Sequence, residues 1–179
     1  SYNGQTLYVS SANESDEKLY IGVRDDGRFV LGTEQAVKDA LDVSAGDSDP
    51  ISGTVRSQLL ENKNAFVSFA SKMPETNDTV AGGQAFNQAE YISGAYYAED
   101  DTIGLEVLMD FPSADNASIV ADQARGVLAT GESQVENETI RNHISKVSID
   151  VSEQMVSVEY ESSVTEFNNL VDTAYEQYY

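Results

Sequence analysis

One arrangement occurs three times in this chain: two short stretches of alternating residues, a tight polar turn between them, and then an amphipathic stretch of helical period. In the first copy, residues 19–23 and 29–31 flank Asp26-Gly27. Asp-Gly between alternating stretches predicts a β-hairpin, because glycine accepts positive φ without steric cost. Thr33 can then cap a helix. The apolar positions of that helix fall on one face: Ala36, Val37, Ala40 and Leu41.

The second and third copies follow the same plan. Residues 91–97 and 103–109 flank an acidic turn at 99–101, and Ser113 can cap the helix that follows. Residues 147–151 and 156–160 alternate most regularly, and the closing stretch 164–175 has an apolar stripe at helical spacing. Strands with one apolar and one polar side predict a sheet that is wet on one face.

The remaining segments complete the predicted organisation. Residues 7–10 should pair with the first hairpin, residues 50–62 indicate a short helix before a strand at 65–69, and residues 137–145 indicate another short helix. Hairpin-plus-helix (ββα) units predict an α+β fold, an antiparallel sheet with helices on one face. We expect an N-terminal half at 1–72, a linker or loop at 73–88 and a C-terminal double ββα half at 89–179, or these halves joined as one continuous domain.

Net charge constrains the environment more than the fold. The chain carries 31 acidic against 10 basic residues, a formal net charge of −21 over 179 residues, spread along its length. A small domain usually carries a net charge of magnitude about 2–8. At ~1 M salt the Debye length is about 3 Å, so surface carboxylates there hardly repel one another. The sequence therefore predicts a halophilic protein with an acidic surface, and it disfavours nucleic acid as a partner.

Catalytic signatures are missing from the sequence. It has no cysteine, no G-x-S-x-G elbow and a single histidine, His143, which lies beside Arg141. We expect a surface or helix-cap role for His143, no cofactor and no enzymatic activity. No apolar run approaches the ~20 residues of a membrane span. Contact with a membrane is therefore expected only through an anchor that this chain lacks.

One acidic loop is a candidate cation site. Asp42, Asp47 and Asp49 lie in one short polar stretch, and carboxylates suit a hard cation such as Ca²⁺ or a monovalent ion. The other two clusters, at 25–26 and 99–101, coincide with predicted hairpin turns, where aspartate is favoured for local reasons. Carboxylate clusters are also expected by chance in so acidic a chain.

Four N-x-[ST] motifs are candidate glycosylation sites. They begin at Asn13, Asn77, Asn116 and Asn137. The motif marks surface loops in secreted proteins, so four copies favour a glycoprotein outside the cytoplasm. Polar turns and helix caps that match by coincidence are the alternative.

Several blocks carry a resemblance to a known group of proteins. They are residues 2–8 (YNGQTLY), residues 29–42 (FVLGTEQAVKDALD), Gly46-Asp47 and residues 92–97 (ISGAYY). In these blocks the chain resembles exported proteins and lipoproteins of haloarchaea and, more distantly, bacterial envelope proteins of uncharacterised function. The resemblance implies an archaeal cell-surface or extracellular location. It also implies a signal or lipobox and a further strand and helix before Tyr2, a part that this chain lacks.

Two functions remain open at this point. The first is a structural or protein-interaction role in the cell envelope, with self-assembly through an exposed edge strand as one form of it. The second is an extracytoplasmic module that binds a small ligand or a cation between its sheet and helices. A pocket lined by convergent polar residues would favour the second function, and an unpaired edge the first.

Overall fold

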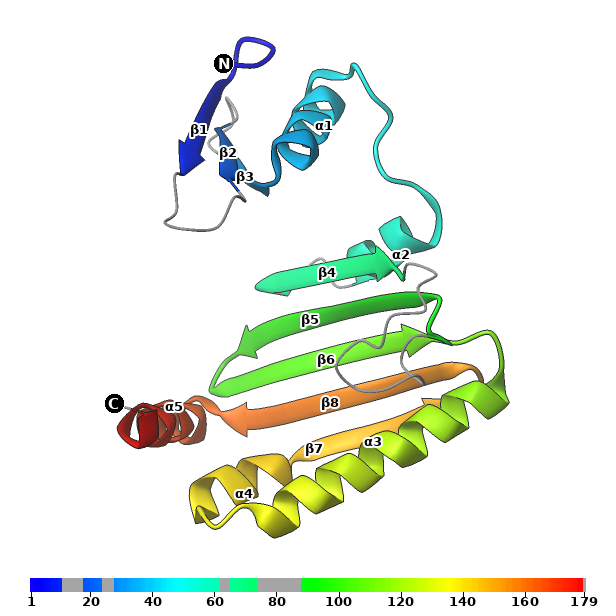
Figure 1. Cartoon of the computed structure of the whole chain (residues 1–179), viewed down its shortest axis with the longest axis vertical. Helices are drawn as coiled ribbons and strands as arrows, with labels where there is room; N and C mark the ends of the chain where they lie inside the picture. The colour runs from blue at the N-terminus through cyan, green and yellow to red at the C-terminus, as the bar shows by residue number, and fades with distance from the viewer. Residues whose placement is uncertain (11–17, 24–27, 62–64, 74–87, 179) are drawn as a thin grey trace. The chain divides into compact units, whose positions relative to one another are not determined.

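The computed structural model describes residues 1–10, 18–23, 28–61, 65–73 and 88–178. These residues form two compact units, Ser1–Ile51 and Ser52–Tyr179, which we call unit 1 and unit 2. Each unit has its own antiparallel sheet (Figure 1). The predicted α+β class is confirmed.

Unit 1 is a three-stranded sheet with one helix. Its strands β1 (Thr6–Ser10), β2 (Leu19–Val23) and β3 (Phe29–Gly32) lie in the order β1-β2-β3, and α1 (Glu34–Ala45) follows. Thr33 caps α1 by accepting a hydrogen bond from the backbone N of Ala36 at 3.3 Å, as predicted. The opening strand pairs with the first hairpin, as expected. The predicted Asp26-Gly27 turn lies outside the described residues.

The core of unit 1 is small. Val37 and Leu41 of α1 are fully buried against β2. They approach the strand at Gly22, where an added Cβ would lie 2.8 Å from Val37 Cγ1. Glycine is therefore required at position 22 for this close approach of helix and sheet.

Unit 2 contains the second and third ββα copies in a five-stranded sheet of order β4-β5-β6-β8-β7. Its elements in chain order are α2 (Gly53–Glu61), β4 (Val67–Lys72), β5 (Tyr91–Glu99), β6 (Thr102–Asp110), α3 (Ala114–Gln134), α4 (Glu138–Ile144), β7 (Val147–Ser152), β8 (Met155–Ser163) and α5 (Val164–Tyr178). The two hairpins, β5–β6 and β7–β8, join through the β6–β8 pair.

The core of unit 2 lies between the sheet and α3, which runs along β7 and β8 (Figure 1). Small residues on α3, Ala117 and Ala121, let its backbone come close to Met109 and Val156. Helix α2 is an exception to the expected one-sided arrangement. Its Gln58 donates from Nε2 to Asp110 Oδ2 at 2.7 Å, and Asp110 alternates with the core-facing Met109, so α2 lies against the opposite face.

The division of the chain differs from the predicted boundary at 72. The structure divides it between Ile51 and Ser52, because β4 pairs along its whole length with β5 and so belongs to the second sheet. Most of the predicted linker at 73–88 lies outside the described residues. Among the residues that are described, no helix is both long and apolar enough to cross a membrane.

Candidate functional site

Within unit 1, no described residue covers one apolar face of the sheet, which we call the open face. Alternation places Gly22 on the side of α1, so its neighbours Ile21 and Val23 point to the other side. The cross-strand register adds Tyr8 and Leu31 to the row of Ile21. The complete apolar set is Tyr8, Leu19, Ile21, Val23, Phe29 and Leu31.

Exposure of these side chains is high for apolar residues. Phe29 is 71% exposed, Tyr8 57% and Leu31 53%, whereas Val37 and Leu41 on the helix side are 0% exposed. A large side chain offers ~150–250 Å² of surface, so the open face exposes about 500 Å² of apolar area. The largest apolar patch on a typical monomer is about 300–600 Å² and is often functional. The open face is therefore a candidate interaction surface.

The two edges of the unit 2 sheet differ. At the β7 edge, Arg125 of α3 donates from Nε and Nη2 to the carbonyl oxygen of Ile149, at 3.1 and 2.7 Å. At the β4 edge, no described residue forms a further strand, and Val67 and Phe69 are 53% and 41% exposed. An uncovered strand edge is a template for another strand.

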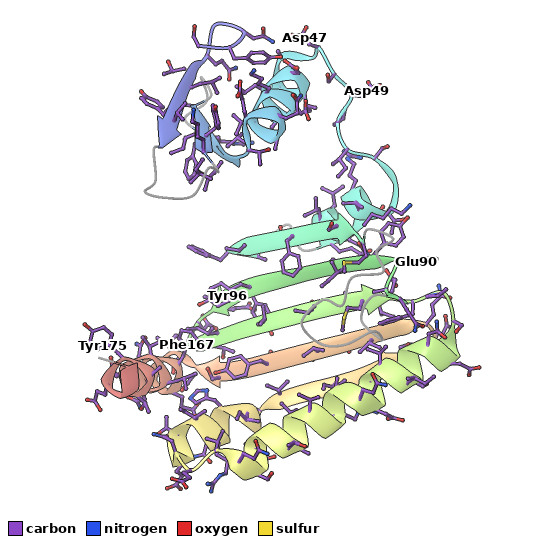
Figure 2. All side chains as sticks on the ribbon, viewed as in Figure 1. Asp47, Asp49, Glu90, Tyr96, Phe167 and Tyr175 are labelled. Carbon is purple, nitrogen blue, oxygen red and sulfur yellow. The ribbon has the colours of Figure 1, made fainter. Side chains whose placement is uncertain are left out.

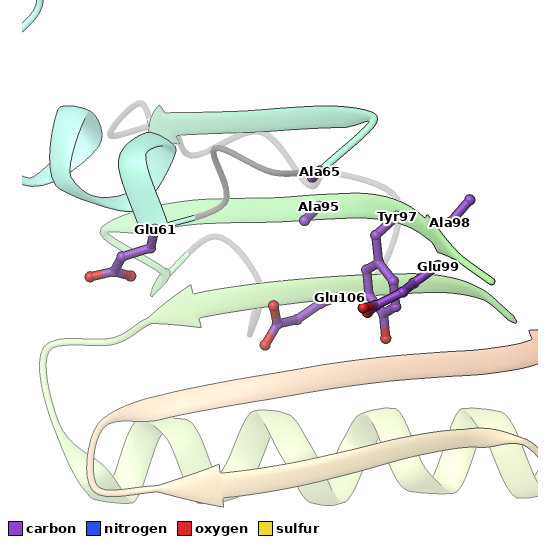
Figure 3. Close-up of a pocket in the computed structure, with 7 residues that line it drawn as sticks. All are labelled: Glu61, Ala65, Ala95, Tyr97, Ala98, Glu99 and Glu106. Atoms are coloured by element: carbon purple, nitrogen blue, oxygen red, sulfur yellow. The ribbon is translucent and has the colours of Figure 1, made fainter.

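A shallow acidic hollow lies on the sheet face opposite α3 (Figure 3). Its volume is about 400 Å³, and its carboxylates are Glu61, Glu99 and Glu106. Glu106 stands directly across from Glu159 of β8 in the register, with their side chains on the same face. Like charges in this position destabilise a sheet, and a bound cation would relieve the repulsion.

Tyr97 forms one wall of the hollow. Its ring lies over Gly104, where an added Cβ would collide with Tyr97 Cζ, and Figure 3 shows the ring crossing β6. Its hydroxyl donates to Glu161 Oε1 at 2.6 Å. This hydrogen bond, partial burial and the nearby glutamates raise the pKa of Tyr97 to about 12. The hollow is thus strongly negative and suits a cationic ligand.

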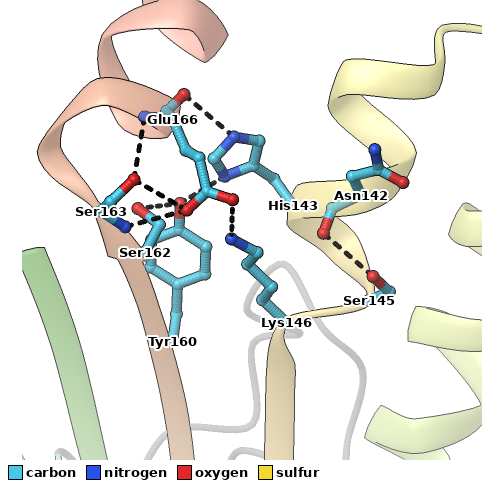
Figure 4. Close-up of polar contacts among 8 residues, drawn as sticks. All are labelled: Asn142, His143, Ser145, Lys146, Tyr160, Ser162, Ser163 and Glu166. Atoms are coloured by element: carbon cyan, nitrogen blue, oxygen red, sulfur yellow. Dashed lines mark hydrogen bonds and ion pairs between the residues drawn. The ribbon is translucent and has the colours of Figure 1, made fainter. Parts of the chain in front are cut away.

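His143 lies in a polar cluster between α4, β8 and α5 (Figure 4). It is only 7% exposed, so the expectation of a surface position was wrong: the ring is drawn inward by two hydrogen-bond partners. Its Nε2 lies 3.1 Å from the carbonyl oxygen of Glu166, which can only accept, and therefore carries a proton. Nδ1 forms the second hydrogen bond of the ring, with the Tyr160 hydroxyl, which in turn donates to Ser162 Oγ at 3.0 Å.

The rest of this cluster forms the start of α5. Ser163 Oγ accepts from the backbone N of Glu166, and Glu166 Oε2 accepts from the backbone N of Ser163, which is a capping box. Lys146 Nζ donates to Glu166 Oε1 at 2.7 Å, and this contact with the Ser163 hydrogen bonds lowers the pKa of Glu166 to about 2. Every polar contact described here joins secondary-structure elements, so we assign the cluster a structural role.

The predicted cation site at Asp42, Asp47 and Asp49 is not assembled in the structure. Asp42 accepts from the Tyr2 hydroxyl at 2.9 Å and from Asn3 Nδ2 at 2.8 Å, so both of its oxygens face the N-terminal turn. Figure 2 shows Asp47 and Asp49 along the segment that follows α1. Across the described parts of the chain, no group of three or more His, Asp or Glu residues is placed to hold a metal ion.

The glycosylation motifs fall in different settings. Asn13 and Asn77 lie outside the described residues. Asn116 is in the first turn of α3, and its Nδ2 donates to Gln88 Oε1 at 2.7 Å. Asn137 is exposed and caps α4 through its Oδ1, which accepts from the backbone N of Ile140. The predicted modification at these sites stays a prediction.

Comparison with protein-family models, curated proteins and solved structures finds no match for this chain.

The open face was missed in the sequence, although a signal was present. Residues 19–23 and 29–31 are apolar at nearly every position, whereas residues 147–151 alternate strictly with polar residues. Apolar residues on both sides of a strand indicate that both faces of its sheet are covered. Since α1 covers only one face, the first hairpin already implied a second covering element.

Proposed function

We propose that this chain is a halophilic cell-surface protein with a structural role and no enzymatic activity, and that it assembles with further copies of itself through the open face. The open face carries the proposal. Six apolar side chains lie together on one side of the unit 1 sheet, while α1 covers only the other side. The archaeal, extracellular location and glycosylation remain part of the proposal, supported by the sequence resemblance and the motifs.

The distribution of charge on the chain favours a second copy as the partner of the open face. Two chains with a net charge of −21 repel each other, yet none of the six apolar side chains of the open face carries charge. Identical sheet faces can pack on each other around a two-fold axis, as the sheets of a sandwich do. The charge-free face is therefore a place where two copies can meet with little electrostatic cost.

The area of the open face and the net charge of the chain predict an association that depends on protein concentration and on salt. Two open faces bury about 1,000 Å² in total, near the lower limit for a specific interface. At ~25 cal/mol per Å² this corresponds to about 25 kcal/mol as an upper bound, from which the 4–15 kcal/mol cost of association and the cost of ordering interface side chains are subtracted. Molar salt screens the acidic surface, and salting-out ions strengthen apolar burial.

A matched pair of substitutions tests this contact. Leu31→Asp puts a carboxylate on the open face, and Ile119→Asp puts one on α3 of unit 2. The two parent side chains are 53% and 55% exposed. Light scattering in 3 M KCl should show that Leu31→Asp lowers the mean mass of the assembled protein, while Ile119→Asp leaves it unchanged. Equal behaviour of the two variants, or a native chain that is monomeric throughout, contradicts the proposal.

The acidic hollow supports a second candidate function, binding of a small cation. The observation that favours it is the opposed pair Glu106 and Glu159 beside Tyr97. Calorimetric titration with Ca²⁺ and with spermidine, in the native chain and in Glu106→Gln, tests this function. Binding that Glu106→Gln abolishes would support it, and binding that survives this change would place the cation elsewhere, with Asp42→Asn as the next variant.

A further inference from the structure

We propose that β4 is a second self-assembly contact, at which β4 of one copy pairs antiparallel with β4 of another, so that the two five-stranded sheets become one continuous sheet. This contact lies in unit 2 and does not depend on the open face. If both contacts form, each chain has two partners, and the protein grows into strings of copies rather than stopping at a dimer.

The backbone of β4 has hydrogen-bonding groups on the side that faces away from β5, where a partner strand can pair. Met73 donates from its backbone N to the carbonyl oxygen of Glu90, one position beyond the Lys72–Tyr91 pair, so the amide of Met73 points toward the β5 side. Hydrogen-bonded and non-hydrogen-bonded pairs alternate in an antiparallel ladder. The amide and carbonyl groups of Ser68, Ala70 and Lys72 therefore point away from β5, toward the open side of the strand.

The opposite edge is closed by contrast. Arg125 places two N–H groups on the Ile149 carbonyl oxygen of β7 and is held there by Asp122 at 3.0 Å. A charged side chain on an edge carbonyl is a known means of blocking edge pairing. No such contact reaches β4 among the described residues. The β7 edge of the sheet is therefore blocked by a charged side chain, whereas no described side chain blocks the β4 edge in this way.

Charge again identifies the partner as a second copy. Residues 62–74 contain no Asp or Glu, which makes this run, with residues 1–13, the longest acid-free stretch in a chain that has 31 acidic residues. The only charged residue within β4 is Lys72. Two copies of an acidic protein can therefore bring their β4 strands together without opposing carboxylates.

The side chains define the register. Phe69 lies across Gly94 of β5, where an added Cβ would be 2.6 Å from Phe69 Cζ, so the ring is anchored within its own sheet. A two-fold axis at Phe69 places it opposite its symmetry mate in a non-hydrogen-bonded pair, with Ser68 opposite Ala70. Aromatic cross-strand pairs stabilise a sheet, and Val67 then extends the apolar surface on the same face.

The first test removes the outward amide. Ala70→Pro deletes a donor that points away from β5 and places the proline ring in the path of a partner strand, a substitution that edge strands tolerate. Ala70→Ser keeps the amide and serves as the matched control. Circular dichroism in the same salt verifies that both variants are folded.

Light scattering in 3 M KCl on the four combinations of Ala70→Pro and Leu31→Asp separates the two contacts. We expect the native chain to exceed a dimer, each single variant to stop at a dimer, and the double variant to be a monomer. A monomeric Leu31→Asp variant would overturn the β4 contact and leave the open face in place. A monomeric Ala70→Pro variant would uphold the β4 contact and refute the open face.

Cysteine cross-linking tests the register without a proline. The chain has no cysteine, so Phe69→Cys introduces a single thiol. In the proposed register its Cα lies about 4.5 Å from its mate, within the range that a disulfide spans. Mild oxidation of Phe69→Cys should give a covalent dimer, whereas Asp150→Cys on β7 should not. Equal cross-linking of both variants would overturn the proposal.

Discussion

Gly22→Ala probes the contact that holds α1 on the sheet of unit 1. The new Cβ would lie 2.8 Å from Val37 Cγ1 and 3.3 and 3.4 Å from the two Leu41 Cδ atoms. Apolar carbons normally pack at about 3.5–4.0 Å. Because both neighbours are fully buried, neither can turn aside into solvent, and the helix must move outward.

The net effect follows from two opposing terms. Overpacking of a core costs about 1–3 kcal/mol, and replacing glycine regains about 0.4–1 kcal/mol from the unfolded chain. We expect unit 1 to lose about 1–2 kcal/mol, which raises its opening equilibrium about 5- to 30-fold. Gly32→Ala is the matched control, because its Cβ would make an ordinary 3.5 Å contact with Ala36 and its φ is not positive.

Hydrogen exchange of the α1 amides, read by mass spectrometry in 3 M KCl, measures this opening directly. Exchange over residues 34–45 should be about 5- to 30-fold faster in Gly22→Ala than in the native chain, and unchanged or slower in Gly32→Ala. Equal exchange in the two variants would refute the close approach of α1 to β2 and, with it, the assignment of the other face as open.

Three further predictions concern salt and pH. Circular dichroism should show the fold lost below a few hundred millimolar salt and regained above ~1–2 M, because only screening removes the repulsion; full stability in dilute buffer would exclude the halophilic interpretation. The pKa of Tyr97 is raised to about 12, so its hydrogen bond to Glu161 stabilises the folded chain fully below pH 10, and this stability is lost as the pH rises through about 12. In an absorbance titration, Tyr97→Phe should therefore remove the last tyrosine to ionise. The pKa of Glu166 is lowered from 4.5 to about 2, so the stability that its ion pair with Lys146 supplies is present above pH 4.5 and is lost as the pH falls through about 2. A Glu166→Gln variant with the same acid unfolding curve as the native chain would contradict this.

Local structure could be predicted from the sequence wherever period and capping agree. The regular alternation of residues 147–151 and 156–160 became β7 and β8, and Thr33 and Ser113 cap α1 and α3 as expected. These features depend on residues near one another in the chain. Local propensity and turn chemistry are sufficient to define them.

Pairing between distant segments could not be predicted in the same way. The strand expected at 65–69 falls in the predicted N-terminal half because the loop signal follows it. In the structure it is β4 (Val67–Lys72), and its partner is β5, across that loop. The position of His143 was missed for a similar reason. Its partners, Tyr160 and Glu166, come from β8 and α5, and no short-range pattern connects them to α4.

The candidate surfaces were only partly foreseeable. An exposed edge strand was part of the structural hypothesis, but which edge is closed depends on Arg125, whose target Ile149 is 24 residues away. The cation site at Asp42 was suggested by charge density alone, and the structure instead uses that carboxylate to hold Tyr2 and Asn3. Charge density does not report which hydrogen bonds a carboxylate already makes.

Self-assembly in molar salt is the central claim, and the mass of the native chain in solution tests it most directly. Static light scattering in 3 M KCl, over a hundredfold range of protein concentration, should give a mass that rises from the 19.4 kDa of one chain to multiples beyond a dimer. A folded chain that stays at 19.4 kDa across the whole range would contradict assembly through either surface.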